Sequence, residues 1–197
     1  RTQIAVNLHD DVGSILSSMS IYSEAAKQSV RENNLPRVTE LIDKIGISAR
    51  ETMGNMSDIV WTINPINDNG IKLFNKMEDF ASPLFHSKQV NFSFQVASEL
   101  FDVDFPMPVR QHVYFIFKEA INNCIKHAEA QHVKVNIDKI QNEYVMRIED
   151  DGKGFDNEKD YNGNGYKSMK QRASELNGTI LFKSANPGTI LVLMFKL

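Results

Sequence analysis

Two glycine-rich stretches contain residues that could bind a nucleotide. Four of the ten glycines, at positions 152, 154, 163 and 165, fall within fourteen residues. The first pair follows Glu149-Asp150-Asp151, where a carboxylate beside a sharp turn could accept a hydrogen bond from an adenine amino group. The second pair leads into a predicted helix, whose free N–H groups could bind a phosphate. The spacing matches neither the P-loop nor the Rossmann fingerprint, so two ordinary turns remain the alternative.

The predicted helix that precedes these glycines carries polar groups on one face. Glu119, Asn123 and Lys126 are spaced by four and three residues, which places them on one side of a helix. Asn122 and His127 lie near enough to reach the same opening. An amide oxygen can ligate Mg²⁺, and a cation can contact phosphate oxygens. A solvated helix face is the alternative, and the conjunction with both glycine turns favours a Mg²⁺-nucleotide site.

A histidine near the amino end, His9, has the surroundings of a nucleophile. Its neighbour Leu8 belongs to a predicted apolar seam, so we expect His9 to flank that seam and to be at least partly exposed. The carboxylate of Asp10 can accept the Nδ1 proton and leave the lone pair of Nε2 free. A histidine beside a helix seam is usually only a surface residue, and the adjacent carboxylate favours the functional interpretation.

The first 68 residues have the apolar spacing of two long helices. Positions spaced by three and four residues are apolar or small in both: Leu8, Val12, Ile15, Met19, Tyr22 and Ala26 in the first helix, and Val38, Ile42, Ile45, Ala49, Thr52, Met56, Ile59 and Ile63 in the second. The polar residues 31–36 predict a tight turn, and Pro65 predicts an end near residues 61–64. One hairpin buries little surface, so we expect a dimeric four-helix bundle. Packing on the second half of the same chain is the alternative.

From residue 69 the pattern changes to strands mixed with helices. Strands are predicted at 90–96, 133–137, 144–149 and 189–196, and helices at 71–87, 108–128 and 168–176. This predicts an α+β chain, with the hairpin at 1–68 followed at 69–197 by an α/β sandwich that has helices on one face of a mixed sheet. The segment Asn64–Gly70 is the predicted linker.

Composition excludes several classes of protein. The net charge of −3 gives no case for a nucleic-acid binder. The longest apolar run, Ile190–Phe195, is too short to cross a bilayer, and the single cysteine, Cys124, excludes an internal disulfide and a multi-cysteine metal site. We therefore expect a cytoplasmic fragment that makes no membrane contact itself. Because it starts inside a predicted helix, we also expect an upstream part, which could anchor the full-length protein in a membrane.

Three motifs resemble those of histidine-kinase ATP domains, which share a Bergerat-type fold with gyrase, mismatch-repair and chaperone ATPases. Residues 119–128 are similar to the N-box, residues 150–155 to the first glycine box and residues 163–173 to the second. Tyr166 departs from the usual aliphatic residue there. The resemblance implies that Asn123 ligates Mg²⁺ with support from Glu119 and that Lys126 and His127 contact phosphates. It also implies that Asp150 accepts a hydrogen bond from the adenine amino group, with support from Thr189. The glycines that would shape the ATP pocket, around a lid at residues 156–162, are Gly152, Gly154, Gly163 and Gly165.

The sequence Leu8-His9-Asp10-Asp11-Val12-Gly13 resembles the phosphoacceptor motif of the histidine-kinase subfamily that includes nitrate-sensing kinases, and residues 61–65 are also similar to it. The resemblance implies that His9 is the phosphoacceptor and Asp10 its base. The expected function is that of a homodimeric, ATP- and Mg²⁺-dependent protein histidine kinase of a two-component system. It would pass the phosphoryl group from His9 to an aspartate in the receiver domain of a response regulator.

Three alternatives remain from other classes. The first is a degenerate kinase that acts as a nucleotide-sensing dimeric scaffold. The second is a related enzyme that phosphorylates a serine of a partner, although the histidine-bearing hairpin disfavours it. The third is a DNA-directed ATPase of the same superfamily, which the acidic charge and the missing transducer domain disfavour.

Overall fold

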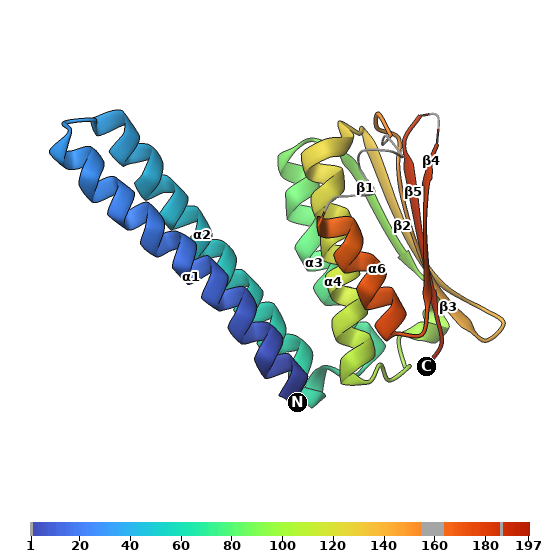
Figure 1. Cartoon of the computed structure of the whole chain (residues 1–197). Coiled ribbons are helices and arrows are strands. Elements are labelled where there is room, and N and C mark those ends of the chain that lie inside the picture. The colour runs from blue at the N-terminus through green and yellow to red at the C-terminus, as the bar shows by residue number, and fades with distance from the viewer. Residues whose placement is uncertain (1, 155–163, 186) are drawn as a thin grey trace. The chain divides into compact units, whose positions relative to one another are not determined.

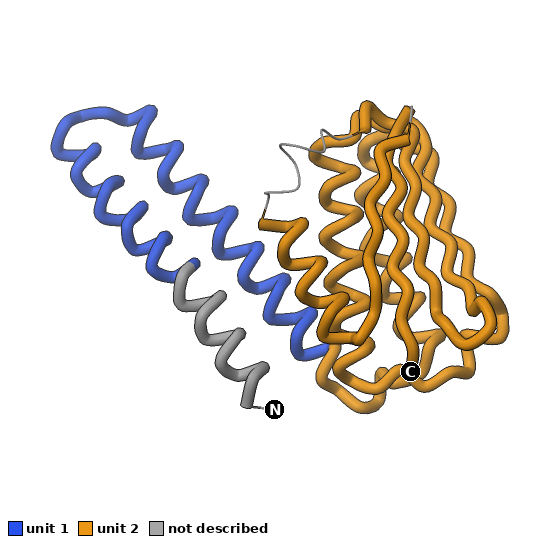
Figure 2. The backbone as a smooth tube through the Cα atoms, turned by 45° about the vertical axis from the view of Figure 1, so that its right-hand side comes forward, with its two compact units in different colours: residues 1–61 blue, residues 62–197 orange. Residues whose placement is uncertain are grey.

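A computed structural model describes residues 2–154, 164–185 and 187–197, with side chains from residue 15 onward. The chain divides into two compact units, residues 1–61 and 62–197 (Figure 2). Gly163 and the predicted lid at residues 156–162 lie outside the described residues. None of the helices in the described ranges has the length and hydrophobicity needed to span a membrane.

Unit 1 is built from two long helices, α1 (Thr2–Arg31) and α2 (Leu35–Ile63), which form a hairpin (Figure 1). The turn between them contains Asn33, whose φ of 53° lies in the left-handed region that asparagine tolerates. The side-chain oxygen of Asn34 accepts a hydrogen bond from the backbone N–H of Arg37 at 3.2 Å and caps α2. Pro36 is the second residue of α2, and the helix ends at Ile63, so the predicted turn and helix end are confirmed.

The predicted apolar seam of α2 is only half covered within one hairpin. Positions that recur every seven residues are covered at least in part: Thr52 is buried, and Val38, Ile45 and Ile59 are half-buried. The exposed positions are Ile42, Met56 and Ile63, with half-buried Ala49 among them. A helix that packs against two neighbours has two such edges, and one hairpin covers only one of them.

Unit 2 contains a five-stranded mixed sheet with the order β1-β2-β3-β5-β4. The strands are β1 (Asn91–Val96), β2 (His132–Ile140), β3 (Glu143–Asp150), β4 (Thr179–Ser184) and β5 (Thr189–Phe195). β1 and β2 are parallel, and the other neighbours are antiparallel. The four predicted strands are thus present. β4 escaped prediction because its apolar core of three residues is too short to show a period.

Helices cover one face of this sheet (Figure 1): α3 (Gly70–Ser87), α4 (Met107–Asn123) and α6 (Asn164–Glu175). The core beneath them includes an aromatic chain in which Phe105 contacts both Phe74 and Tyr144 edge to face, with ring centroids 5.6 Å apart in each pair. Alternate residues of β2, Val133, Val135 and Ile137, point into the same core. The predicted α+β class with helices on one sheet face is therefore confirmed. α6 begins four residues earlier than predicted.

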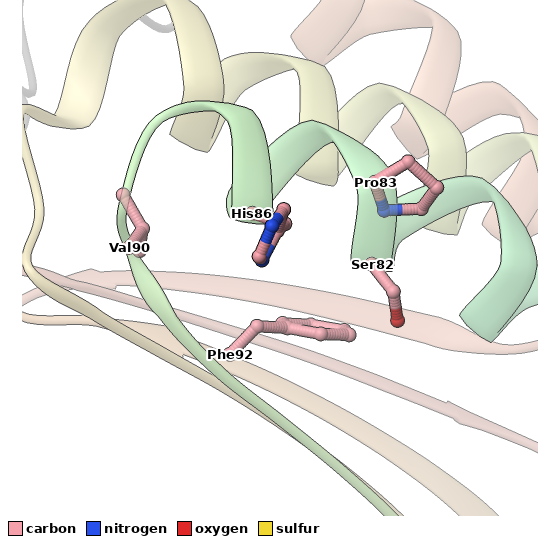
Figure 3. A pocket seen from close by; sticks show the side chains of 5 residues that line it. All are labelled: Ser82, Pro83, His86, Val90 and Phe92. Carbon is pink, nitrogen blue, oxygen red and sulfur yellow. The ribbon is translucent and has the colours of Figure 1, made fainter.

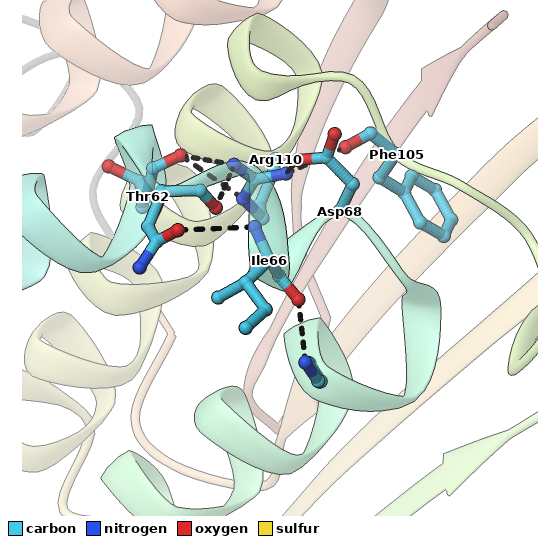
Figure 4. A network of polar contacts seen from close by, with 7 residues as sticks. Thr62, Ile66, Asp68, Phe105 and Arg110 are labelled. Atoms are coloured by element: carbon cyan, nitrogen blue, oxygen red, sulfur yellow. Dashed lines mark hydrogen bonds and ion pairs between the residues drawn. The ribbon is translucent and has the colours of Figure 1, made fainter.

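The segment predicted to link the two halves folds as part of unit 2. Residues Pro65–Asn67 form a short 3₁₀ helix, η1, capped by the side chain of Asn64. The Arg110 side chain of α4, which is fully buried, donates to the backbone oxygens of Thr62 at 2.5 and 3.1 Å and of Asn64 at 3.2 Å, and it forms an ion pair with Asp68 (Figure 4). Residues 62–68 are therefore fixed to α4 by one side chain.

Candidate functional site

A cavity of about 640 Å³ opens between the end of α4, the end of β3 and the first turn of α6. The residues that line it come from both glycine stretches and from the helix that precedes them. Its lining includes Glu119, Asn122, Asn123, Lys126, His127, Asp150, Gly154, Gly165 and Thr189, together with Cys124, Lys153, Tyr166, Met169 and Phe182. Most of the residues selected from the sequence thus lie around one opening.

The polar groups on one side of the cavity come from α4 and from the π-helical turn that continues it, η3 (Cys124–Ala128). Glu119 and Asn123 are one α-helical turn apart, whereas Lys126 and His127 lie in the wider π turn. Turns of this kind are often found at functional sites. The residue after η3, Glu129, has a left-handed φ of 55°. The spacing of the residues predicted one face, and two consecutive residues of the π turn, Lys126 and His127, line the same cavity.

Asp150, the last residue of β3, also lines the cavity. Strand register places Asp150 beside Thr189 of β5, and both the side chain and the backbone of Thr189 donate hydrogen bonds to its carboxylate. The backbone N–H of Gly152 donates to Oδ1 at 3.0 Å, and the thiol of Cys124 lies 3.9 Å from Oδ2. Burial raises the pKa of Asp150, and the hydrogen bonds from Gly152 and Thr189 partly offset that rise. Asp150 is therefore a half-buried acceptor held in place from three sides.

Cys124 is a protonated thiol in this environment. Burial, followed by the negative charge of Asp150, raises its pKa to about 12. A thiol with such a pKa is a poor nucleophile at neutral pH. Its contribution to the cavity is its small volume and a weak S–H donor toward Asp150.

Two glycines allow backbone segments to approach closely at this site. A Cβ at Gly152 would overlap the carbonyl oxygen of Ala128, so the turn after β3 packs directly on the end of η3. A Cβ at Gly165 would overlap the carboxylate of Glu119, so the first turn of α6 lies against α4. Gly152 is therefore packed against backbone that a larger residue would overlap, whereas Gly165 leaves room for the carboxylate of Glu119.

The sequence did not identify the aromatic wall of the cavity. The rings of Tyr166 and Phe182 are tilted against each other with centroids 4.6 Å apart. Tyr166 was visible as an unusual residue in the second glycine stretch, but Phe182 gave no signal because its strand, β4, was not predicted. His9 and Asp10 lie in α1, and their side chains are outside the described residues.

A second depression, of about 440 Å³, lies between α3 and β1 (Figure 3). It is shallow and is lined by Ser82, Pro83, His86, Val90 and Phe92. It brings together one hydroxyl and one imidazole, which do not form the convergent polar set of a binding site. The cavity at the end of α4 is the better candidate.

Comparison with known proteins agrees with this assignment. Residues 109–197 match the family described as histidine kinase-, DNA gyrase B- and HSP90-like ATPases, and residues 1–68 match a family described as histidine kinase. The chain is 28% identical over 180 residues to the sensor protein VraS of Staphylococcus epidermidis and 27% identical to that of Staphylococcus aureus. Each alignment covers 91% of this chain and 50% of the relative, so the chain spans about half the length of the curated relatives it matches.

Solved structures show a similar fold. The Acinetobacter baumannii histidine kinase AdeS matches 93% of this chain and 96% of its own, with a TM-score of 0.66 and 13% identity. The blue-light activated histidine kinase of Erythrobacter litoralis EL346 matches 92% of this chain and 63% of its own, with a TM-score of 0.56 and 17% identity. At these identities the likeness concerns the fold alone.

Proposed function

The chain belongs to the two-component sensor histidine kinases, with an ATP-binding domain in its second half, and from this premise we propose that it phosphorylates its own His9. In the proposed reaction Nε2 of His9 forms a bond to the γ-phosphorus of ATP, the bond to the β–γ bridging oxygen breaks, and ADP leaves. The phosphoryl group then passes to an aspartate in the receiver domain of a response regulator. Asp10 would hold the imidazole in the tautomer that has a free Nε2 lone pair.

The observation that carries this proposal is the arrangement of the cavity. Lys126 supplies a cation and His127 a hydrogen-bonding imidazole for the triphosphate, and Asp150 supplies a hydrogen-bond acceptor for the adenine amino group, all lining the same cavity. A side chain at Gly152 would push the turn after β3 away from η3, and one at Gly165 would displace the carboxylate of Glu119. These features suit a nucleotide better than they suit a scaffold that had lost its ligand.

The same donor set fits a magnesium ion bound together with the nucleotide. The amide oxygen of Asn123 would hold the ion, with the carboxylate of Glu119 one turn earlier in support, because Mg²⁺ prefers oxygen ligands and keeps some from substrate phosphates. When bound, the ion neutralises charge on the phosphate oxygens. Lys126 and His127 orient the phosphate chain from the protein side.

The proposal is tested by incubating the chain with γ-labelled ATP and Mg²⁺. We expect label on the protein that is lost in acid and retained in alkali, as befits a phosphorus–nitrogen bond. Acid-stable label would instead indicate a serine kinase. Tight nucleotide binding without label would favour the degenerate scaffold.

Nucleotide affinity is expected to decrease as the pH falls through the raised pKa of Asp150. The charged carboxylate accepts a hydrogen bond from the base, and the protonated form puts a donor in its place. Because burial raises this pKa, the loss begins above the ordinary value of about 4 for an aspartate. The dissociation constant of ATP, measured from pH 8 to pH 5, should rise more steeply in the wild-type chain than in Asp150→Asn. All other titrating groups are common to both proteins, so the difference between the two profiles isolates Asp150. Parallel profiles would contradict the assignment.

Replacing Gly152 with alanine is expected to weaken ATP binding at least about tenfold. The new Cβ would overlap the carbonyl oxygen of Ala128, so the turn that presents Asp150 must move away from η3. The matched control is Gly54→Ala in α2, where no atom lies within 4 Å of the new Cβ. Isothermal titration should show wild-type affinity for the control, and an equal affinity for Gly152→Ala would disprove the tight approach.

We further propose that two copies of the chain form a homodimer through the exposed edge of α2. Ile42, Met53, Met56, Val60 and Ile63 form a row on one side of the helix, and each is more than 40% exposed in a single chain. A row of large apolar side chains on a two-helix hairpin is what a four-helix bundle would bury.

The substitution Ile42→Glu is expected to shift the dimer to monomers by placing a charge in that row. The matched control is Ile47→Glu, because Ile47 is similarly exposed but lies about 140° away around the helix axis. Analytical ultracentrifugation should find monomers for Ile42→Glu and dimers for Ile47→Glu at the same concentration. Dimers in both variants would place the interface elsewhere.

A further inference from the structure

The second aspartate of the first glycine stretch, Asp151, does not line the cavity but is tightly held. Its Oδ1 accepts hydrogen bonds from the backbone N–H groups of Gln131 and His132, both at 2.8 Å. Its Oδ2 lies 2.7 Å from Nδ1 of His132. The backbone N–H of Asp151 also donates to the carbonyl oxygen of His132 at 3.2 Å. One side chain thus fastens the end of β3 to the start of β2.

The segment fastened in this way connects two walls of the cavity. Residues 128–132 lead from the end of η3, which carries Lys126 and His127, to the first residue of β2. The backbone N–H of Lys153 donates to the carbonyl oxygen of Ala128 at 2.9 Å, and Gly152 packs on the same carbonyl group. Movement of residues 131–132 away from Asp151 would therefore loosen the turn that follows Asp150.

The carboxylates of the neighbouring residues Asp150 and Asp151 contact different parts of the domain. Successive side chains of a strand point to opposite sides, so the carboxylate of Asp150 faces the cavity while that of Asp151 faces the loop before β2. Hydrogen bonds from the backbone and ring of His132 and from the backbone of Gln131 lower the pKa of Asp151 to about 2, so it is charged at neutral pH. A charged acceptor forms the stronger hydrogen bonds that positioning requires.

We propose that Asp151 is a positioning residue for base recognition. Its carboxylate fixes the backbone that presents Asp150, and it thereby sets the preference for a purine with an exocyclic amino group without touching the nucleotide. Asn91 of β1 supports the arrangement, because its side-chain nitrogen lies 3.3 Å from Nε2 of His132. This inference rests on the proposed function, in which Asp150 reads the amino group of adenine.

The test compares ATP with inosine triphosphate, which has a carbonyl oxygen where adenine has its amino group. Dissociation constants are measured in Mg²⁺ by competition with a fluorescent nucleotide. We expect the wild-type chain to bind ATP at least about tenfold more tightly than inosine triphosphate. Asp151→Ala should reduce this ratio of the two dissociation constants at least about fivefold, and the dissociation constant of inosine triphosphate itself should change little. Asp151→Asn should fall between them, because its amide oxygen can still accept from the backbone N–H groups.

The matched control is Glu149→Gln, which removes a carboxylate two residues earlier on β3 that is bound to Arg147 instead. Its ratio should equal that of the wild-type chain. An unchanged ratio in both Asp151 variants, or equal weakening of both nucleotides, would overturn the inference, since general loss of structure does not discriminate between bases. Asp150→Ala, which removes the acceptor altogether, distinguishes failure of the proposed role of Asp150 from failure of the role of Asp151: if Asp150→Ala keeps the wild-type ratio, the proposed role of Asp150 fails. If it loses the ratio and the Asp151 variants do not, only the role of Asp151 fails.

Discussion

The His9→Gln variant is expected to carry no phosphoryl label after incubation with γ-labelled ATP and Mg²⁺, while it binds ATP with wild-type affinity. Glutamine has a similar length but lacks a ring nitrogen with a free lone pair, so it cannot replace the nucleophile. Among the residues that the structure describes, those that line the cavity proposed to bind ATP all lie between Glu119 and Leu191. Loss of the acceptor should therefore separate labelling from binding. Scintillation counting after alkaline gel electrophoresis measures the first quantity, and calorimetry measures the second.

Two further variants control this experiment. His86→Gln makes the same substitution at an exposed histidine of α3 and should leave both labelling and binding unchanged. Asn123→Ala should also lose the label, but because Mg²⁺-dependent nucleotide binding fails and not because the acceptor is missing. Alkali-stable label that persists in His9→Gln would show that another residue accepts the phosphoryl group.

Much of the fold was predictable because it depends on short-range patterns. The seam positions Val38, Ile45, Thr52 and Ile59 lie where their spacing placed them, and alternation located β1 and β2. The candidate site was predictable for a related reason: Glu119, Asn123 and Lys126 are close in sequence, and the glycines mark turns that must approach another segment. Residue types with few structural alternatives, such as glycine in a crowded turn, carry most of this information.

The features that were not predictable depend on contacts between distant segments. Asp151 and His132 are nineteen residues apart, and nothing in either local sequence indicates that strand register brings them together. The π turn of η3 has the same composition as an ordinary helix end. The burial of Arg110 is a further example, since arginine is rarely buried without a partner, and its partners Thr62, Asn64 and Asp68 lie more than forty residues upstream. The segment after α2 consequently resembled a free linker.

Arg110 is also the residue whose loss is expected to cost the most stability. Replacing it with methionine keeps much of the side-chain volume but removes every donor. The carbonyl oxygens of Thr62 and Phe105 would lose their bonds to the guanidinium group, and Asp68 would lose its ion-pair partner. The carboxylate of Asp68 is 40% exposed and stays solvated, whereas leaving buried carbonyl oxygens without a donor typically costs about 1–3 kcal/mol. We expect Arg110→Met to lower the free energy of unfolding of unit 2 by about that amount.

The control is Arg147→Met on β3, because Arg147 is also paired with a carboxylate, that of Glu149, but its side chain is 40% exposed. Exposed ion pairs contribute about 0–1 kcal/mol, so this variant should unfold close to the wild-type chain. Urea titrations followed by circular dichroism measure both. Trp61, the single tryptophan, directly precedes Thr62, and its fluorescence should change at lower urea in Arg110→Met than in Arg147→Met. Equal midpoints for the two variants would mean that residues 62–68 are held by their own turn and helix caps rather than by Arg110.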